Sequence, residues 1–92
     1  MNMVETDVQE EVEVKGKTTE NKDLIVYNDD FNTFDHVIET LVKVCEHEII
    51  QAEQCTWIIH YNGKCSVKKG SMEELTPMRR AMSERGIDAK IH

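Results

Sequence analysis

The stretch from Leu24 to Asn32 constrains the fold more than any other part of the chain. It opens with the apolar run Leu-Ile-Val-Tyr and changes at once to Asn-Asp-Asp, which are turn-forming residues. This pattern predicts a buried strand over 24–28, followed by a turn and a helix. The oxygens of the turn either only form turns and helix caps, the usual role of these residues, or belong to a site for a ligand with positive charge or many hydrogen-bond donors.

Two helices are predicted directly after this strand. Apolar residues at helical spacing indicate the first over 34–46, with Asn32 or Thr33 as its cap. The second is expected over 48–61, and the pair Asn62-Gly63 closes it because both residues tolerate the left-handed conformation of a helix end. Four residues are expected to share one face of this second helix, with Cys55 and Ile58 beside it: Ile49, Ala52, Thr56 and Ile59.

The C-terminal third predicts a strand, a helix and a last strand. Residues 65–68 alternate between apolar and polar, and Gly70 is expected to turn the chain. Residues 71–74, Ser-Met-Glu-Glu, match a capping box that opens a third helix, which Pro77 should bend or delay and Gly86 should end. The final strand alternates over 87–91. The order β-α-α-β-α-β predicts an α+β domain, with a three-stranded sheet covered on one face by three helices.

Composition limits the classes of function. With 92 residues the chain supports one domain, which we expect over 23–92, preceded by a flexible acidic tail over 1–22. The net charge is −7 and the chain contains no basic stripe, so nucleic-acid binding is not expected. No apolar run is long enough to cross a bilayer, and the N-terminus lacks the pattern of a leader peptide, so we expect no membrane partner and a cytoplasmic location.

Catalysis, metal binding and cofactors are not expected either. Cys45, Cys55 and Cys65 form no Cys-x-x-Cys pair, and no spacing places one of them beside a histidine that could activate it. Cys45 and His47 would make half of a zinc site without a second half. We therefore interpret the three cysteines as reduced, mostly buried thiols and the protein as a non-enzyme.

A family resemblance joins the opening stretch to a later one. Residues 28–37, Asn-Asp-Asp-Phe-Asn-Thr-Phe-Asp-His-Val, together with His60-Tyr61-Asn62-Gly63, resemble the ClpS family of protease adaptors, whose pattern is Asn-Asp-Asp-aromatic-Thr-Pro-Met-x-x-Val and later His-x-x-Gly. The resemblance implies an adaptor that binds N-degrons, which are free N-termini beginning with a large hydrophobic residue. It also implies delivery of these substrates to a ClpA- or ClpC-type AAA+ unfoldase coupled to the ClpP protease.

The resemblance assigns roles to ten residues. The substrate's α-amino group would be held by Asn28, Asp30, Asn32 and His60. The pocket for the first side chain would be lined by Val26, Phe34, Val37, Thr56, Ile59 and Ile87. A neutral histidine accepts a hydrogen bond and a charged one cannot, so binding is expected to weaken below about pH 6.

Three positions depart from the family pattern. Phe34 replaces a Met at the pocket mouth, Thr33 replaces a Pro, and Thr56 stands where members often have Met. The wall at Thr56 is expected to be smaller and more polar, and the set of accepted first residues is expected to change. These departures keep an alternative open, in which the chain is a ClpS-like interaction module or a regulator of the unfoldase that does not read N-degrons.

Overall fold

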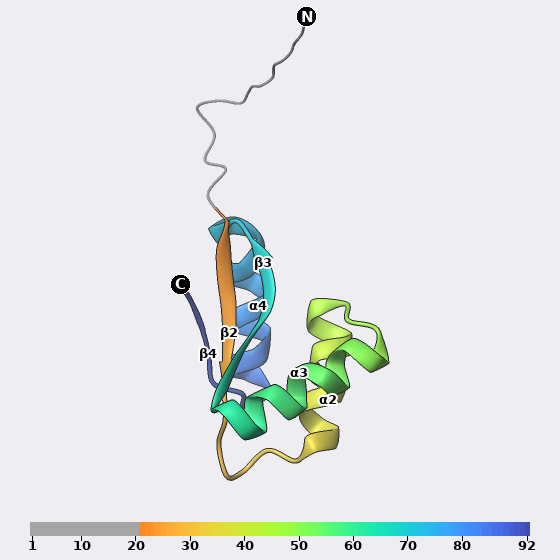
Figure 1. Cartoon of the computed structure of the whole chain (residues 1–92). Coiled ribbons are helices and arrows are strands. Elements are labelled where there is room, and N and C mark those ends of the chain that lie inside the picture. The colour runs from red at the N-terminus through yellow and green to blue at the C-terminus, as the bar shows by residue number, and fades with distance from the viewer. Residues whose placement is uncertain (1–20) are drawn as a thin grey trace, which may run out of the picture.

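The computed structural model describes residues 21–92, so the expected tail over 1–22 lies almost entirely outside the described residues. The elements follow the predicted order: β2 (Lys22–Tyr27), α2 (Phe34–Cys45), α3 (Ile49–Asn62), β3 (Lys64–Gly70), α4 (Met72–Glu84) and β4 (Ala89–Ile91). The three strands form one antiparallel sheet in the order β3-β2-β4, with the three helices on one side of it (Figure 1). The predicted fold class is confirmed.

The sheet is organised around β2, which pairs with both of the other strands. Leu24 and Val26 point into the core, while Ile25 between them lies on the opposite face, as the period of two requires. The strand ends at Tyr27, one residue earlier than predicted, although the backbone N–H of Asn28 still donates to the carbonyl of Gly63, 2.9 Å away, in the same register. β3 is longer than predicted, and Gly70 is its last residue rather than a turn, paired with Lys22.

The helix ends follow local signals in the sequence. Thr33, not Asn32, caps α2, because its Oγ1 accepts the backbone N–H of His36 at 3.1 Å. Gly63 ends α3 with φ at 92°, in the left-handed region that favours glycine. Of the residues on the predicted face of α3, Ala52, Thr56 and Ile59 are buried, whereas Ile49 is 62% exposed. Its turn of α3 lies at the end of the helix that extends away from the sheet (Figure 1).

The capping box of α4 is present. Ser71 Oγ accepts the N–H of Glu74 at 3.1 Å, and the Ser71 N–H donates to Glu74 Oε1 at 2.8 Å. The helix runs through Pro77 from Met72, so Pro77 does not delay its start. At the other end, Gly86 has φ at 80°, and its N–H donates to the Ser83 carbonyl at 3.0 Å. The Ile87 N–H donates to the Met82 carbonyl at 2.9 Å, which completes a Schellman motif.

The core lies between the sheet and the helices, and every element contributes to it. Its most deeply buried side chains are Leu24, Leu41, Leu75 and Met82. Packing of apolar residues from all three strands and all three helices holds β2, α2 and α3 in fixed relative positions. Within residues 21–92, no helix combines the length and the apolar character that a membrane span requires.

Candidate ligand-binding site

The structure brings the ten residues that the resemblance selects to one place. A cavity of about 270 Å³ opens where β2 runs into the turn before α2. Eight of the ten residues line it: Asn28, Asp30, Asn32, Phe34, Val37, Thr56, Ile59 and His60. The other two, Val26 and Ile87, line a smaller space of about 20 Å³ that shares Val37 and Ile59 with the cavity. The ten residues selected from the sequence therefore line two adjoining spaces that form one candidate site.

Backbone contacts explain how residues about thirty positions apart in the sequence meet here. The N–H of Asn28 donates to the carbonyl of Gly63, the residue that ends α3. Tyr27 pairs with Lys64, the first residue of β3. The end of β2 is thus fixed to the end of α3, which carries His60 one turn before Gly63. Asn28 and His60 consequently line the same opening.

Asp29 organises the turn, a role that the sequence list of site residues did not include. Its carboxylate accepts the backbone N–H groups of Phe31 and Asn32, both at 2.8 Å, and the Nδ2 of Asn32 at 2.7 Å. Burial opposes ionisation of this carboxyl, but the hydrogen bonds from Asn32 and Phe31 together outweigh it and hold its pKa below the ordinary value. Asp-x-x-Asn spacing in a turn was the signal available in the sequence.

Asn32 connects the turn to the end of α4. Its Nδ2 donates both to Asp29 and, at 3.0 Å, to the carbonyl of Gly86. The amide protons are therefore occupied inside the protein, and Oδ1 is the part of the side chain left for a ligand. This geometry limits the role that the resemblance implies for Asn32: its side chain can accept from an amine, and it also fixes the turn.

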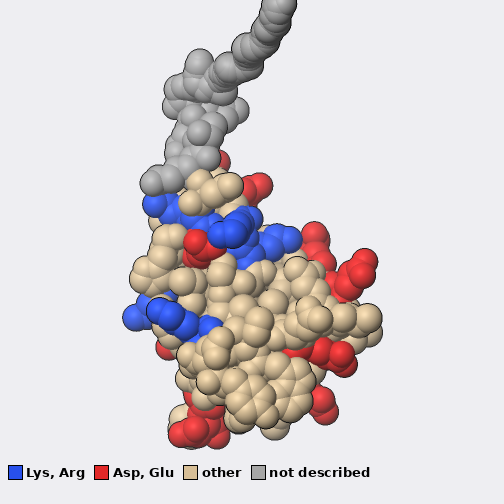
Figure 2. Space-filling view, viewed as in Figure 1, with Lys and Arg blue, Asp and Glu red and all other residues tan. Residues whose placement is uncertain are grey.

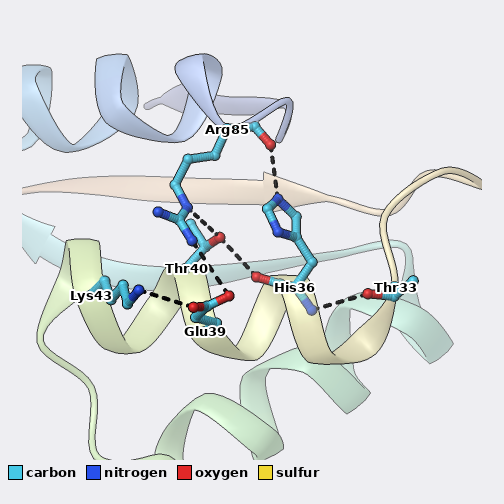
Figure 3. A network of polar contacts seen from close by, with 6 residues as sticks. All are labelled: Thr33, His36, Glu39, Thr40, Lys43 and Arg85. Atoms are coloured by element: carbon cyan, nitrogen blue, oxygen red, sulfur yellow. Dashed lines mark hydrogen bonds and ion pairs between the residues drawn. The ribbon is translucent and has the colours of Figure 1, made fainter.

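A second set of polar contacts joins α2 to the same end of α4 (Figure 3). His36 Nε2 lies 2.9 Å from the carbonyl of Arg85, and since a carbonyl only accepts, the ring nitrogen is the donor. Arg85 Nε donates to Thr40 Oγ1 at 2.9 Å, and the guanidinium lies 3.7 Å from Glu39. The start of α2, which carries Phe34 and Val37 into the cavity, is thereby held in place.

The cavity is polar at its rim and apolar at its base. Asn28, Asp30 and His60 are exposed, whereas Val37 and Ile59 are buried. Thr56 is also buried, and its hydroxyl donates to the carbonyl of Ala52 at 2.7 Å. Its proton is therefore not available to a ligand, so this wall is less polar than the sequence suggested. The site can hold a group with several donors at its rim and an apolar group beneath it.

Aromatic rings continue from the cavity onto α3, and the sequence list omitted two of them. The Phe34 ring lies edge-on to Trp57, with centroids 4.8 Å apart, and edge-on to His60 at 5.2 Å. Trp57 stacks on Tyr61 at 5.3 Å, with ring planes 8° apart. The signal was present in the sequence, because residues three or four apart on a helix are neighbours and Trp57 precedes His60 and Tyr61 by these spacings.

None of the three cysteines is among the residues that line the cavity. Cys45 is buried, Cys55 and Cys65 are partly buried, and all three are free. Burial raises the pKa of both Cys45 and Cys65 to about 11, which keeps these thiols protonated at neutral pH. Within the described part of the chain, no group of three or more His, Cys, Asp or Glu side chains is placed to hold a metal ion.

The chain is similar to a known protein family and to individual members of that family. The family model described as "ATP-dependent Clp protease adaptor protein ClpS" matches residues 17–88. The ATP-dependent Clp protease adapter protein ClpS of Thermosynechococcus vestitus is 39% identical over 67 residues, which cover 72% of this chain and 71% of that protein. The protein of the same name from a Nostoc species is 45% identical over 58 residues, covering 62% of this chain and 60% of that protein.

Proposed function

Because the chain belongs to the ClpS family of Clp protease adaptors, we propose that it binds free protein N-termini that begin with a large hydrophobic residue. We propose further that it delivers these substrates to a ClpA- or ClpC-type AAA+ unfoldase. The observation that carries the proposal is the cavity with exposed acceptors at its rim and an apolar base. An N-terminal residue has the same division, with a charged amine and a side chain on one carbon atom.

The rim supplies what an α-ammonium group needs. The group carries one positive charge and three donors, so it requires acceptors, with an anion among them. Asp30 offers a carboxylate, Asn28 an amide oxygen and neutral His60 a ring nitrogen, all around one opening. The internal bonds of Asp29 fix the backbone of this turn, so the acceptors are held in position before the ligand arrives.

The base of the cavity suits a large apolar side chain. Val37, Ile59 and Phe34 provide apolar surface, and Thr56 donates its hydroxyl proton to a carbonyl of its own helix. Two charge-assisted hydrogen bonds contribute about 1.5–3 kcal/mol each, and burial of a Phe or Leu side chain about 1.5–3 kcal/mol. After the entropy of association is subtracted, these contributions are consistent with a Kd of the order of micromolar.

Fluorescence anisotropy tests the proposal directly. Four labelled peptides share one sequence after the first residue, and they begin with Phe, Leu, Ala or N-acetylated Phe. The peptides that begin with free Phe or Leu should bind at least about tenfold more tightly than the other two, because acetylation removes the charge and Ala leaves the apolar base empty. Equal binding of all four peptides would refute recognition of the free N-terminal residue and favour the alternative, in which the protein regulates the unfoldase.

Matched variants test the residue roles. Asp30→Asn should weaken binding of the Phe peptide by about tenfold or more, since it replaces the anion at the rim with a neutral amide. Asp35→Asn is the control: Asp35 is also an exposed acid near the mouth, but it lies outside the residues that line the cavity. Equal losses in both variants would show that only the general negative charge matters.

A further inference from the structure

An exposed pair of stacked rings lies beside the mouth of the cavity. The Trp57 side chain is 49% exposed and that of Tyr61 is 72% exposed, although both are large and aromatic. Their rings are nearly parallel, with centroids 5.3 Å apart. We call these two residues the aromatic platform. Stacking covers only one face of each ring, and the exposure of both residues shows that flat apolar surface of the pair remains open to solvent.

The aromatic platform is continuous with the rim of the proposed site. The Tyr61 ring lies 5.0 Å from that of His60, and the Trp57 ring lies 4.8 Å from that of Phe34, both of which line the cavity. Successive Cα atoms of a peptide are about 3.8 Å apart, so a residue that follows one held at His60 comes within contact distance of the platform when the chain leaves over α3.

The charges around the platform favour a cation more than an anion. α3 contains no Lys or Arg, and Glu53 lies one helical turn before Trp57. Figure 2 shows uncharged surface over the region of α3, with Asp and Glu side chains along its right and lower borders and Lys or Arg side chains on the left, beside the sheet. The groups that gain most from contact with flat rings are other aromatic rings and the planar guanidinium of arginine, which also carries the favoured charge.

We propose that Trp57 and Tyr61 form a subsite for the second residue of the bound N-terminus, with preference for a planar side chain, either aromatic or a guanidinium. This proposal rests on the proposed function, because it requires the first residue to sit in the cavity. The preferred substrates would then be proteins with a large hydrophobic first residue and Tyr, Phe, Trp or Arg as the second residue.

Peptides that begin Phe-Tyr, Phe-Arg, Phe-Lys, Phe-Leu and Phe-Ala, with a common remainder, test the subsite by anisotropy. Phe-Tyr and Phe-Arg should bind about two- to tenfold more tightly than Phe-Ala, from the usual strength of ring contacts. Phe-Lys and Phe-Leu separate planarity from charge and from apolar area. Trp57 is the chain's single tryptophan, so its emission should change with Phe-Tyr and Phe-Arg more than with Phe-Ala.

Variants locate the preference on the molecule. Trp57→Leu and Tyr61→Ala should each reduce the preference for Tyr and Arg while leaving Phe-Ala binding within about twofold. The control is Phe31→Ala, which removes the ring of a residue that is 93% exposed, belongs to the turn before α2 and is not among the residues that line the cavity. This variant should keep the preference.

Each other outcome overturns the proposal. Equal binding of all five peptides, still abolished by acetylation, would remove the subsite and leave the proposed function intact. Loss of the preference in Phe31→Ala but not in Trp57→Leu would place the second residue over the turn. If no peptide with a free Phe terminus binds, the proposed function fails and the subsite fails with it.

Discussion

The substitution Asn32→Asp tests whether the turn before α2 is fixed by the contacts described for it. The change keeps the size and shape of the side chain but removes both donors, because an ionised carboxylate only accepts. The new carboxylate would lose the 2.7 Å bond to Asp29 Oδ2 and the 3.0 Å bond to the Gly86 carbonyl. It would also stand directly against the Asp29 carboxylate.

The cost can be assembled from these contacts. A hydrogen bond to a charged group contributes about 1.5–3 kcal/mol and a neutral one about 0.5–1.5 kcal/mol. Two like charges about 4 Å apart repel by about 1 kcal/mol in water and about 4 kcal/mol near a protein surface. Because Asn32 is only partly buried, the low end of each range applies, and the free energy of unfolding should fall by about 3 kcal/mol at neutral pH. For a domain of this size, that corresponds to a Tm lower by roughly 12–24 °C.

Thermal unfolding at two pH values measures this effect. At about pH 7 the deficit should be complete, whereas at about pH 3 protonation removes one charge and restores a donor, so the deficit should shrink. The matched control is Asn28→Asp, the same change in the same exposed turn, where the side chain makes no hydrogen bond to residues 21–92. A Tm for Asn32→Asp within about 3 °C of the wild type at neutral pH, or an equal deficit at both pH values, would refute the reasoning.

Three further results are expected. The pKa of Asp29 is held below its ordinary value of 3.8, so the ionised carboxylate contributes its full stabilisation above pH 3.8 and loses it as the pH falls through the lowered pKa. Urea unfolding at about pH 5 and about pH 2 measures this loss, which should be smaller in Asp29→Ala than in the wild type. Gly63→Ala meets no atom within 4 Å but must adopt φ at 92°, so the unfolding free energy should fall by about 1–2 kcal/mol through backbone strain alone, and an unchanged value would contradict this. Ser71→Ala should lower the free energy of unfolding by about 1 kcal/mol by removing the cap of α4, whereas Ser83→Ala, at an exposed serine inside the same helix, should lower it less.

The candidate site was predictable to the extent that its residues follow a family pattern. All ten selected residues line the cavity or the space beneath it. Two features were not found in this way. Asp29 holds the turn through three hydrogen bonds; the Asp-x-x-Asn spacing was the signal for this role, but the family pattern assigned Asp29 none. Thr56 is polar by residue type, yet its hydroxyl proton bonds to the Ala52 carbonyl, which only the helix geometry reveals.

The sequence by itself determined the order of the elements and most of their ends. The cap at Thr33, the capping box at Ser71 and the left-handed Gly63 and Gly86 all depend on groups within a few residues of one another, so short-range patterns suffice to predict them. A shared helix face did not by itself determine burial: Ala52 and Ile59 lie over the core and are buried, whereas Ile49 on the same face is exposed.

Only the tertiary structure decided which ends come together. The bond from the Asn28 N–H to the Gly63 carbonyl, the bond from Asn32 Nδ2 to the Gly86 carbonyl and the contact of Trp57 with Phe34 join segments that are distant in the sequence. These contacts depend on how the helices pack against the sheet, and no pattern of neighbouring residues predicts contacts between segments so far apart in the sequence. The acceptors of the turn became the rim of a cavity because this packing brought the end of α3 to the end of β2.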